Sequence, residues 1–472
     1  MASLVAYGAY LPKHRLKRTE IGAVLGAGGG KGTRTVAGYD EDPTSMAVEA
    51  ARLALKSAAG RSPVRVLYAT ANPPYLDKTN ANVIHAALRL DPSALAIDMV
   101  GSVRSGVGAL LMGIESSVPT LVVLSDIRTG MPGGADERDG GDGAVALLFD
   151  PDGPGLVELV AQASSTEEFL DRWRLPGAPA PRVWEERFGE HAYLPHADAA
   201  FAAALKQAQL APGEVDLLIV AGTHGRAVKA FAGAAGVPRV ADDLANTVGN
   251  TGTAHPGILL GRALDEATPG QTVALVVLAD GATAMIFKVA EGIRQYRPAS
   301  TVEAQLGGGD DSLRYADFIN WRGYLTKEPP RRPDPVGPAA PPSRRSGSYK
   351  YGFVAHRCAE CGTLHLPAVR VCVTCKATDR MVEVPMADRQ GTIATFTIDR
   401  LAFSPSPPVI AAVVDFDGGG RFSCELTDAD PAQLAIGDRV EMTFRRIITA
   451  SGVHNYFWKA RPASGATTGE EA

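Results

Sequence analysis

Residues 101–115, GSVRSGVGALLMGIE, and residues 249–264, GNTGTAHPGILLGRAL, decide the fold of this chain, because they are two copies of one pattern. Each copy opens with a turn of small residues and continues into an apolar helix. Gly101 and Gly113 of the first copy fall on glycines of the second copy without a gap. A spacing of roughly 150 residues is too long for a solenoid, so the repeat predicts two stacked halves.

The flanking segments repeat in the same order. The further pairs are VRVLYATAN (64–72) with VDLLIVAGTH (215–224), LVVLSD (121–126) with LVVLAD (275–280), and DGAVALLF (142–149) with DGATAMIF (280–287). The first copy carries an extra loop, residues 127–141. Strand-length apolar runs alternate with Ala-rich helical stretches as far as residue 290, which is typical of an α/β fold. Two such halves, related by a pseudo-twofold axis, would surround one shared site with their paired loops.

Composition excludes several classes of protein. The chain has 472 residues and a formal net charge of −5 at pH 7, so it has no basic footprint for nucleic acid or an anionic membrane surface. No apolar run reaches the roughly 18 residues that a transmembrane helix needs. The N-terminus lacks the pattern of a signal peptide. We therefore expect a cytoplasmic protein of two to four domains that builds its own core.

Cysteines occur only near the C-terminus. The chain has five of them, and the first is residue 358, so a cysteine nucleophile is excluded from the repeated region. Two Cys-x2-Cys pairs with ten residues between them predict a closed four-thiolate site, formed by Cys358, Cys361, Cys372 and Cys375. Such a site is structural, and it fits zinc better than a rubredoxin-like iron. We expect His365 to be a bystander and Cys424 to be buried and inert.

Changes in composition along the chain predict five regions. These are a repeated module (1–290), a connecting segment with a proline-rich tether (291–349), a cysteine ribbon (350–383), a small β domain (384–464) and a disordered tail (465–472). The tether, residues 329–345, holds so many prolines that an extended conformation is expected. The β domain alternates strands with Gly-, Pro- and Asp-containing turns, which fits a small barrel of the OB type.

Four motifs of the repeated module resemble the thiolase superfamily, especially HMG-CoA synthase and ketoacyl-ACP synthase III. They are LAIDMVGSVRSGVGALL (95–111, the nucleophile loop), GGDGAVALLF (140–149), THGRAVKAF (223–231, the histidine loop) and GNTGTAHPGILL (249–260, the asparagine loop). The segment RCAECGTLHLPAVRVCVTC (357–375) and the β domain after it resemble the zinc-ribbon plus OB-fold proteins that accompany thiolase-like enzymes. The resemblance implies a duplicated five-layered α/β fold, a zinc ribbon and an OB-fold barrel.

The resemblance also implies a site. The cysteine nucleophile of the superfamily falls on Val103, whose side chain cannot attack a thioester. The histidine and asparagine fall on His224 and Asn250, which would bind a developing enolate or oxyanion. The general-base glutamate of HMG-CoA synthases falls on Ala71. With two of these four groups missing, the resemblance argues against a working HMG-CoA synthase.

Several residues near these positions are weaker candidates. Ser102 and Ser105 carry the hydroxyl groups near the vacant nucleophile position. Either one would need an adjacent base to attack a thioester. A serine at a helix N-terminus is usually a helix cap. The Arg- and Trp-rich segment 171–193 lacks helical periodicity, so we expect a lid loop over the site. The candidate bases in this segment are Glu186, His191 and Tyr193. Its arginines would either bind the phosphates of CoA or face solvent; they are Arg172, Arg174, Arg182 and Arg187. His255 is a candidate second imidazole, whereas Asp126, Asp142 and Asp280 close strands and are expected to stabilise turns.

These observations favour a cytoplasmic, dimeric acyl-CoA enzyme that works without a cysteine nucleophile. The leading prediction is a C–C lyase that performs aldol or retro-aldol chemistry on a 3-hydroxyacyl-CoA. An alternative is Claisen condensation or acyl transfer, either directly between two thioesters or through Ser102. Another is a non-catalytic scaffold that binds acyl-CoA for a partner thiolase. If the chain is a lyase, acyl-CoA dehydrogenases or hydratases are plausible partner enzymes. The acidic net charge argues against binding of nucleic acid by the barrel.

Overall fold

The structure, a computed structural model, describes residues 1–328 and 336–463. They divide into two compact units. The first comprises Met1–Gly38, Asp42–Ile84 and Leu90–Tyr324, and the second takes Tyr39–Glu41, His85–Arg89 and the chain from Leu325 onward. The expected tail at 465–472 and the first part of the proline-rich tether lie outside the described residues.

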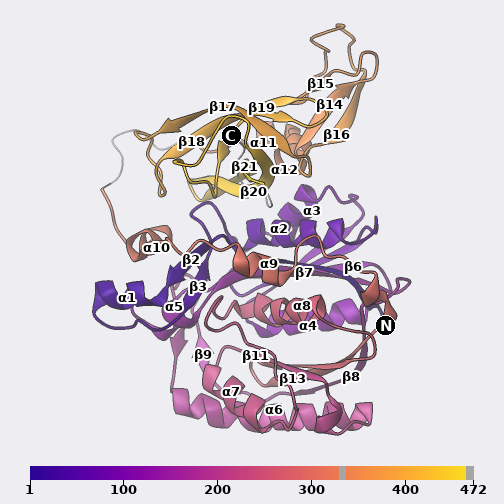
Figure 1. The fold of residues 1–472 in the computed structure, drawn as a ribbon, viewed down its shortest axis with the longest axis vertical. Helices are drawn as coiled ribbons and strands as arrows, with labels where there is room; N and C mark the ends of the chain where they lie inside the picture. Colours follow the sequence, from indigo (N-terminus) through magenta and orange to yellow (C-terminus); the bar gives the residue numbers. More distant parts are fainter. Residues whose placement is uncertain (329–335, 464–472) are drawn as a thin grey trace, which may run out of the picture. The chain divides into compact units, whose positions relative to one another are not determined.

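One nine-stranded sheet runs through the first unit. Its strands, in spatial order, are β11 (Leu217–Gly222), β12 (Thr272–Leu278), β13 (Ala282–Val289), β8 (Val157–Ser165), β1 (Ser3–Tyr10), β7 (Asp142–Asp150), β6 (Thr120–Ile127), β4 (Arg65–Thr70) and β5 (Leu95–Val100). Between β8 and β1 the ladder holds a single pair, Leu4 with Val157. Because the sheet is nearly broken there, its two halves form separate layers (Figure 1).

Helices complete a stack of five layers, helix–sheet–helix–sheet–helix (Figure 1). Helix α2 (Pro43–Lys56) packs on β1, β6 and β7 from outside. Helices α4 (Arg104–Ile114) and α8 (His255–Asp265) lie between the sheet layers. Helices α6 (Glu186–Ala208) and α7 (Gly225–Ala234) cover the other outer face. The predicted five-layered α/β fold is therefore confirmed.

The two copies of the sequence pattern form equivalent halves. In the first, β6 pairs in parallel with β4 and antiparallel with β7; in the second, β12 pairs in the same way with β11 and β13. Glycines let the middle helices approach the strands closely. A Cβ on Gly113 would lie 2.6 Å from Cγ2 of Val122, and a Cβ on Gly257 would lie 2.5 Å from Cγ1 of Val145. Any larger side chain at either glycine would force the layers apart.

Shorter elements decorate this core. They are β2 (His14–Lys17), α1 (Arg18–Leu25), β3 (Thr33–Val36), α3 (Ala81–Ala87), α5 (Ala135–Asp139), β9 (Arg172–Trp173), β10 (Arg182–Val183), α9 (Val302–Gly307) and α10 (Tyr315–Trp321), with the 3₁₀ helices η1 (Pro212–Glu214), η2 (Gly252–Ala254) and η3 (Glu291–Arg294). One expectation needs correction here. Residues 186–193, predicted as part of a lid loop, are the first turns of α6. Gly189 and Tyr193 pack there against His224, a tertiary contact that the local periodicity does not reveal.

The second unit contains a small sheet and a closed barrel. The sheet has the order β15 (Leu364–His365), β14 (Val354–Cys358), β16 (Met381–Pro385), and the barrel has the order β17 (Gly391–Asp399), β18 (Val409–Phe416), β19 (Arg421–Leu426), β21 (Val453–Pro462), β20 (Arg439–Ala450). Two short helices, α11 (Ala340–Arg345) and α12 (Gly347–Gly352), precede the sheet. Helix α11 corrects the expectation of an extended tether up to residue 345. Its prolines stand at the first helical positions, where the missing N–H costs nothing.

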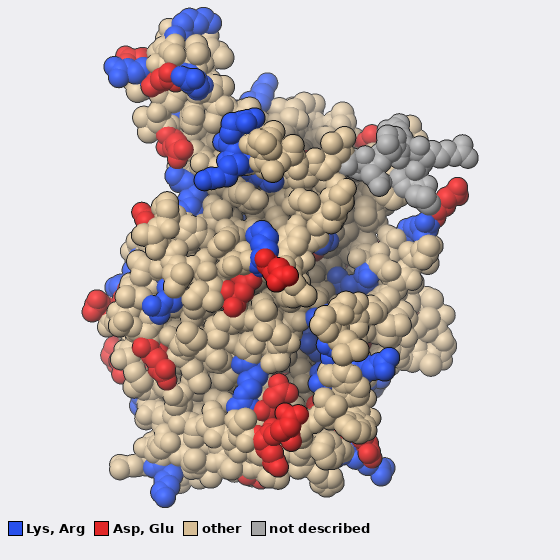
Figure 2. Space-filling view, turned by 180° about the vertical axis from the view of Figure 1, so that it is seen from behind, with Lys and Arg blue, Asp and Glu red and all other residues tan. Residues whose placement is uncertain are grey.

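Neither sign of charge dominates the face of the molecule that Figure 2 shows. On the face shown in Figure 2, basic and acidic side chains alternate singly or in small groups. Across residues 1–328 and 336–463, no helix combines the length and the apolar character that crossing a membrane requires.

Candidate active site

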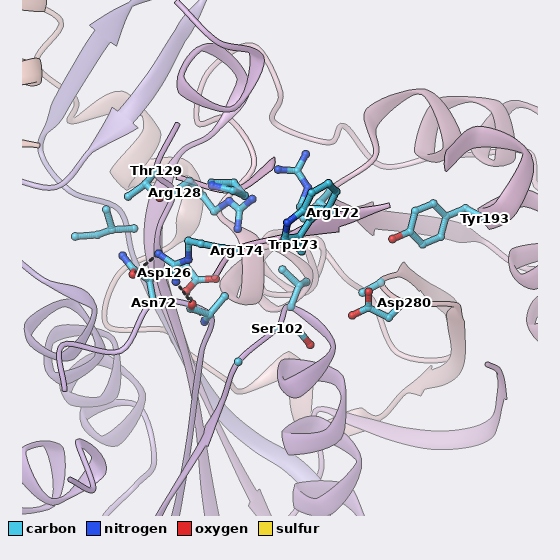
Figure 3. A pocket seen from close by; sticks show the side chains of 17 residues that line it. Asn72, Ser102, Asp126, Arg128, Thr129, Arg172, Trp173, Arg174, Tyr193 and Asp280 are labelled. Carbon is cyan, nitrogen blue, oxygen red and sulfur yellow. Dashed lines mark hydrogen bonds between the residues drawn. The ribbon is translucent and has the colours of Figure 1, made fainter. Parts of the chain in front are cut away.

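A pocket lies in the first unit, where strands of both halves end. Ala71 follows β4, and Asp126 lies at the end of β6. Thr223 and Asp280 follow β11 and β12 of the second half. The predicted shared site between paired loops therefore has a structural counterpart (Figure 3).

The N-terminus of α4 forms one wall of this pocket. Gly101, Ser102 and Val103 line it, and the side chain of Val103 makes no hydrogen bond to the helix terminus. At this terminus the Ser105 and Gly106 N–H groups donate to the Ser102 and Val103 carbonyl oxygens at 3.1 and 3.0 Å. The positive end of the helix dipole at this wall can still stabilise negative charge on a bound carbonyl oxygen. A valine side chain offers neither a nucleophile nor a proton. Within the described residues, nothing accepts a hydrogen bond from the Ser102 hydroxyl.

Asp126 stabilises the floor of the pocket. Its buried carboxylate accepts hydrogen bonds from the Thr70 hydroxyl at 2.8 Å, the Ala71 N–H at 2.8 Å and the Thr253 N–H at 2.7 Å. These donors come from the ends of β4 and from η2, so one side chain joins loops of both halves. The structural role expected for Asp126 agrees with this geometry.

Asp280 differs from Asp126 in its surroundings. It is exposed, lines the pocket and has the left-handed backbone conformation, with φ 47°, followed by Gly281 at φ 106°. Its carbonyl oxygen accepts a hydrogen bond from the guanidinium of Arg104. No residue of the described chain donates a hydrogen bond to its carboxylate, which lies on the same side of the pocket as Ser102 (Figure 3). This carboxylate is available to accept a proton from a ligand.

The sequence suggested only a turn-forming role for Asp280. A signal was nevertheless present in the repeat. The first copy separates its two strands with residues 127–141, whereas the second runs directly from LVVLAD into DGATAMIF. The resulting tight turn needs left-handed backbone at its centre, and such backbone strain is concentrated at functional sites.

His224 is held by the backbone. It precedes α7, and its Nδ1 accepts a hydrogen bond from the Ala227 N–H at 3.1 Å, which leaves Nε2–H to donate to the Glu186 carbonyl oxygen at 2.7 Å. The imidazole is buried and is not among the groups that line the pocket, although the ring of Tyr193, which does line it, lies 5.9 Å away. Both ring nitrogens are thus engaged, and the predicted catalytic role stays a prediction.

Asn250 and His255 are also engaged. The Asn250 amide donates to the Gly222 carbonyl oxygen at 2.6 Å and accepts from the Gly252 N–H at 2.9 Å. His255 is buried at the start of α8, with Nδ1 3.3 Å from the hydroxyl of Thr251. Neither side chain lines the pocket. The loops that resemble catalytic loops therefore use these polar groups to fix their own backbone.

Part of segment 171–185 lines the pocket, and its role as a lid stays a prediction. Arg172, Trp173 and Arg174 line the pocket (Figure 3), whereas Arg182 and Arg187 are exposed and outside it. Arg174 donates to the Asn72 side-chain oxygen at 2.8 Å and to the Ala71 carbonyl oxygen at 2.6 Å. Arg172 pairs with the carboxylate of Asp136.

Asp171 and Tyr193 form a buried pair at the edge of this segment. Burial raises the pKa of the Asp171 carboxyl, against the opposing effects of His224 and Arg172. Burial also raises the pKa of the Tyr193 hydroxyl well above its ordinary value, and the charge of Asp171 adds to the shift. Both groups therefore resist ionisation beside the pocket wall.

A candidate metal site lies in the second unit. One sulfur from each of Cys358, Cys361, Cys372 and Cys375 lies within 4.8 Å of the other three. Two equivalent turns hold them. The Gly362 N–H donates to the Cys358 carbonyl oxygen and the Lys376 N–H donates to the Cys372 carbonyl oxygen, and both donors have left-handed backbone. Four thiolates so arranged fit a tetrahedral zinc ion with no open position.

Cys424 lies on β19, away from this cluster. Burial raises the pKa of its thiol to about 12, so it stays protonated, as an inert structural cysteine would.

Comparison with known proteins identifies the second unit first. A family model described as "ChsH2, C-terminal OB-fold domain" matches residues 383–445. That range covers most of the closed barrel. The predicted OB fold is therefore confirmed.

The repeated module is similar to hydroxymethylglutaryl-CoA synthases. The enzyme of Pyrobaculum aerophilum is 30% identical over 344 residues, which span 68% of this chain and 96% of that protein. The enzyme of Aeropyrum pernix is 28% identical over 317 residues, which span 63% of this chain and 87% of that protein.

Solved structures show the same fold. A hydroxymethylglutaryl-CoA synthase complexed with CoA has a TM-score of 0.56 at 17% identity, covering 68% of this chain and 89% of that one. The 3-oxoacyl-[acyl-carrier-protein] synthase III of Aquifex aeolicus has a TM-score of 0.52 at 20% identity, covering 61% and 100%. At these identities the likeness establishes the thiolase-like fold.

Proposed function

The chain belongs to the hydroxymethylglutaryl-CoA synthase family, and from this we propose that it binds CoA thioesters in the pocket and joins them by carbon–carbon bond formation without an acyl-enzyme intermediate. One observation carries the proposal. One pocket is lined by the N-terminus of α4, by the side chain of Val103, which has no thiol, and by Asp280. The relatives are named as synthases, which supports condensation over the lyase reaction that the sequence alone favoured.

The chemistry follows from those groups. Asp280 takes a proton from the carbon next to the thioester carbonyl, and the negative charge moves to the carbonyl oxygen as the enolate forms. The positive end of the α4 dipole stabilises that oxygen. The enolate carbon then attacks the carbonyl carbon of a second thioester directly, and the bond from that carbon to sulfur breaks. CoA leaves as the thiolate and takes up the proton that Asp280 holds, which restores the carboxylate. Val103 fills the space of a nucleophile without taking part, and Ser102 stays a bystander.

Zinc belongs to this proposal as a structural ion. Cys358, Cys361, Cys372 and Cys375 would hold it, and it would stabilise the turns of the ribbon. His224 and Asn250 act as positioning residues, since their hydrogen bonds fix the loops beside the pocket. On the basis of the resemblance, the proposal also includes a homodimer and a partner enzyme, which would be a thiolase, an acyl-CoA dehydrogenase or a hydratase.

The test is turnover by zinc-loaded full-length protein, with mass spectrometry of both products and protein. We expect pairs of acyl-CoAs to give a longer acyl-CoA and free CoA, with no added mass on the chain. Asp280→Asn should lower kcat by roughly 10²–10⁴-fold. Asp311→Asn removes an exposed carboxylate that pairs with Lys17, so it is the matched control and should leave kcat unchanged.

Other outcomes separate the alternatives. An acyl group on Ser102 would establish acyl transfer through that residue. Cleavage of a 3-hydroxyacyl-CoA into a shorter acyl-CoA and a ketone or aldehyde, without condensation, would establish the lyase. CoA binding with no conversion of any thioester would establish the scaffold.

A further inference from the structure

Three guanidinium groups line the same pocket as Val103 (Figure 3). Two of them, Arg172 and Arg174, are already bound by acceptors of the protein, as described above. Arg128 is the third. No described residue accepts a hydrogen bond from its guanidinium or forms an ion pair with it.

The position of Arg128 is nevertheless fixed. Its N–H donates to the carboxylate of Asp142 at 3.0 Å, and its carbonyl oxygen accepts from the Arg34 guanidinium at 3.2 Å. Two glycines pack on its aliphatic stem: a Cβ on Gly140 would lie 2.9 Å from the Cβ of Arg128, and a Cβ on Gly252 would lie 2.8 Å from its Cδ. The described residues thus hold this guanidinium in place without a hydrogen bond or an ion pair to it, and Asp126 and Asp136 act on it only at longer range.

Holding that charge there is unfavourable until an anion arrives. Burial lowers the pKa of Arg128, and the positive charge of Arg172 lowers it further, against the opposing effects of Asp126 and Asp136. A charge that is partly removed from water needs a partner of opposite sign. A ligand anion at this point would therefore gain binding energy that a neutral ligand could not.

The chemistry of guanidinium restricts the anion to a carboxylate or a phosphate, since both match its planar fork of donors. The phosphates of CoA are separated from its thioester by the whole pantetheine arm. One molecule whose thioester lies at Val103 therefore cannot bring those phosphates into the same small pocket. A carboxylate at the far end of a short acyl chain can reach it.

We infer that Arg128 binds the free carboxylate of the acyl group, so that the substrate class is a CoA thioester of a short dicarboxylic acid. The inference rests on the proposed function, because it assumes that the thioester lies at the N-terminus of α4. It adds a specificity-determining residue that takes no part in bond making.

The experiment is calorimetric binding of glutaryl-CoA, its neutral monoamide and free CoA to full-length protein. Mass spectrometry confirms that the ligands stay intact. We expect wild-type protein to bind glutaryl-CoA at least roughly tenfold more tightly than the monoamide, in line with a hydrogen-bonded charge pair. Arg128→Gln should abolish that preference, and Arg128→Lys should keep part of it. Arg294→Gln is the control, because Arg294 is an exposed partner of Glu291.

Each other result overturns a defined part of the argument. An equal loss for glutaryl-CoA and the monoamide in Arg128→Gln would make Arg128 a structural residue. A loss of free CoA binding would place a phosphate there. Equal binding of both thioesters by wild-type protein would overturn the inference and leave the proposed function standing. Binding of neither thioester would overturn the proposed function as well.

Discussion

At the scale of single residues, burial decides what each histidine can do. His255 is 4% exposed at the start of α8. Its Nδ1 lies near the hydroxyl and the N–H of Thr251. Burial lowers the pKa of this imidazole from 6.5 to about 4, with a smaller opposing effect of Asp243. A histidine that stays neutral in this way holds the turn before α8 rather than transferring protons at neutral pH.

That lowered pKa makes stability depend on pH. Between pH 6.5 and pH 4 the unfolded chain binds a proton at residue 255 and the folded chain does not. Stability must therefore fall as the pH falls through this window, by about 3 kcal/mol in all. Urea unfolding of wild-type protein and of His255→Gln at several pH values measures this, because other titrating groups contribute equally to both proteins.

The matched control is His191→Gln, which removes an exposed histidine from α6. This variant should show the same acid sensitivity as the wild type. If His255→Gln also keeps the full wild-type slope between pH 6.5 and pH 4, the imidazole of His255 titrates normally and the prediction fails.

At the scale of elements, close packing of α6 on the loop of His224 explains where that helix begins. Gly189 lies in the first turn of α6. A Cβ on Gly189 would lie 2.6 Å from Cδ2 of His224 and 2.8 Å from Oδ1 of Asp171. The helix can approach the imidazole closely enough for the Glu186 carbonyl oxygen to accept a hydrogen bond from Nε2–H of His224 only because residue 189 has no side chain.

We therefore expect Gly189→Ala to destabilise the protein by about 1–3 kcal/mol through overpacking, despite the better helix propensity of alanine. Gly233→Ala is the matched control. Gly233 is an exposed glycine of α7 with no atom near its missing Cβ, so alanine there should stabilise by about 0.5–1 kcal/mol. Denaturant midpoints measure both changes. Equal stabilisation by the two alanines would show that the contact with His224 is loose.

The sequence predicted the features that follow from its internal repeat and from the spacing of its cysteines. The paired segments gave the stacked halves and the position of the pocket at strand ends, and the cysteine spacing gave the ribbon. The sequence did not reveal those properties of site residues that depend on contacts with residues far away in the chain. Among the described residues, the carboxylate of Asp280 has no hydrogen-bond donor because a left-handed turn exposes it. The guanidinium of Arg128 has no acceptor there, although two distant glycines hold its stem. The nitrogens of His224 are engaged by a helix that local periodicity did not predict.

At the scale of the whole molecule, the two units differ in how they are stabilised. The first unit has an extensive apolar core across both sheet layers. In the second unit, the ribbon strands β14, β15 and β16 form only a small sheet, and most side chains of β16 are at least partly exposed. A sheet this small needs a further constraint to be stable, and the four-cysteine cluster is in the right place to supply one through a bound metal.

Removal of the metal should therefore unfold the ribbon and leave the first unit intact. We expect about one zinc ion per chain and, after chelation, fast amide hydrogen exchange over residues 354–385 with unchanged protection of β6 and β12, because a structural zinc site contributes its binding energy to folding. Cys361→Ser should reproduce this loss and lower the zinc content. Cys424→Ser, which removes a half-buried thiol outside the cluster, should keep both the metal and the protection. Undisturbed exchange over the ribbon after complete metal removal would mean that its strands fold without zinc.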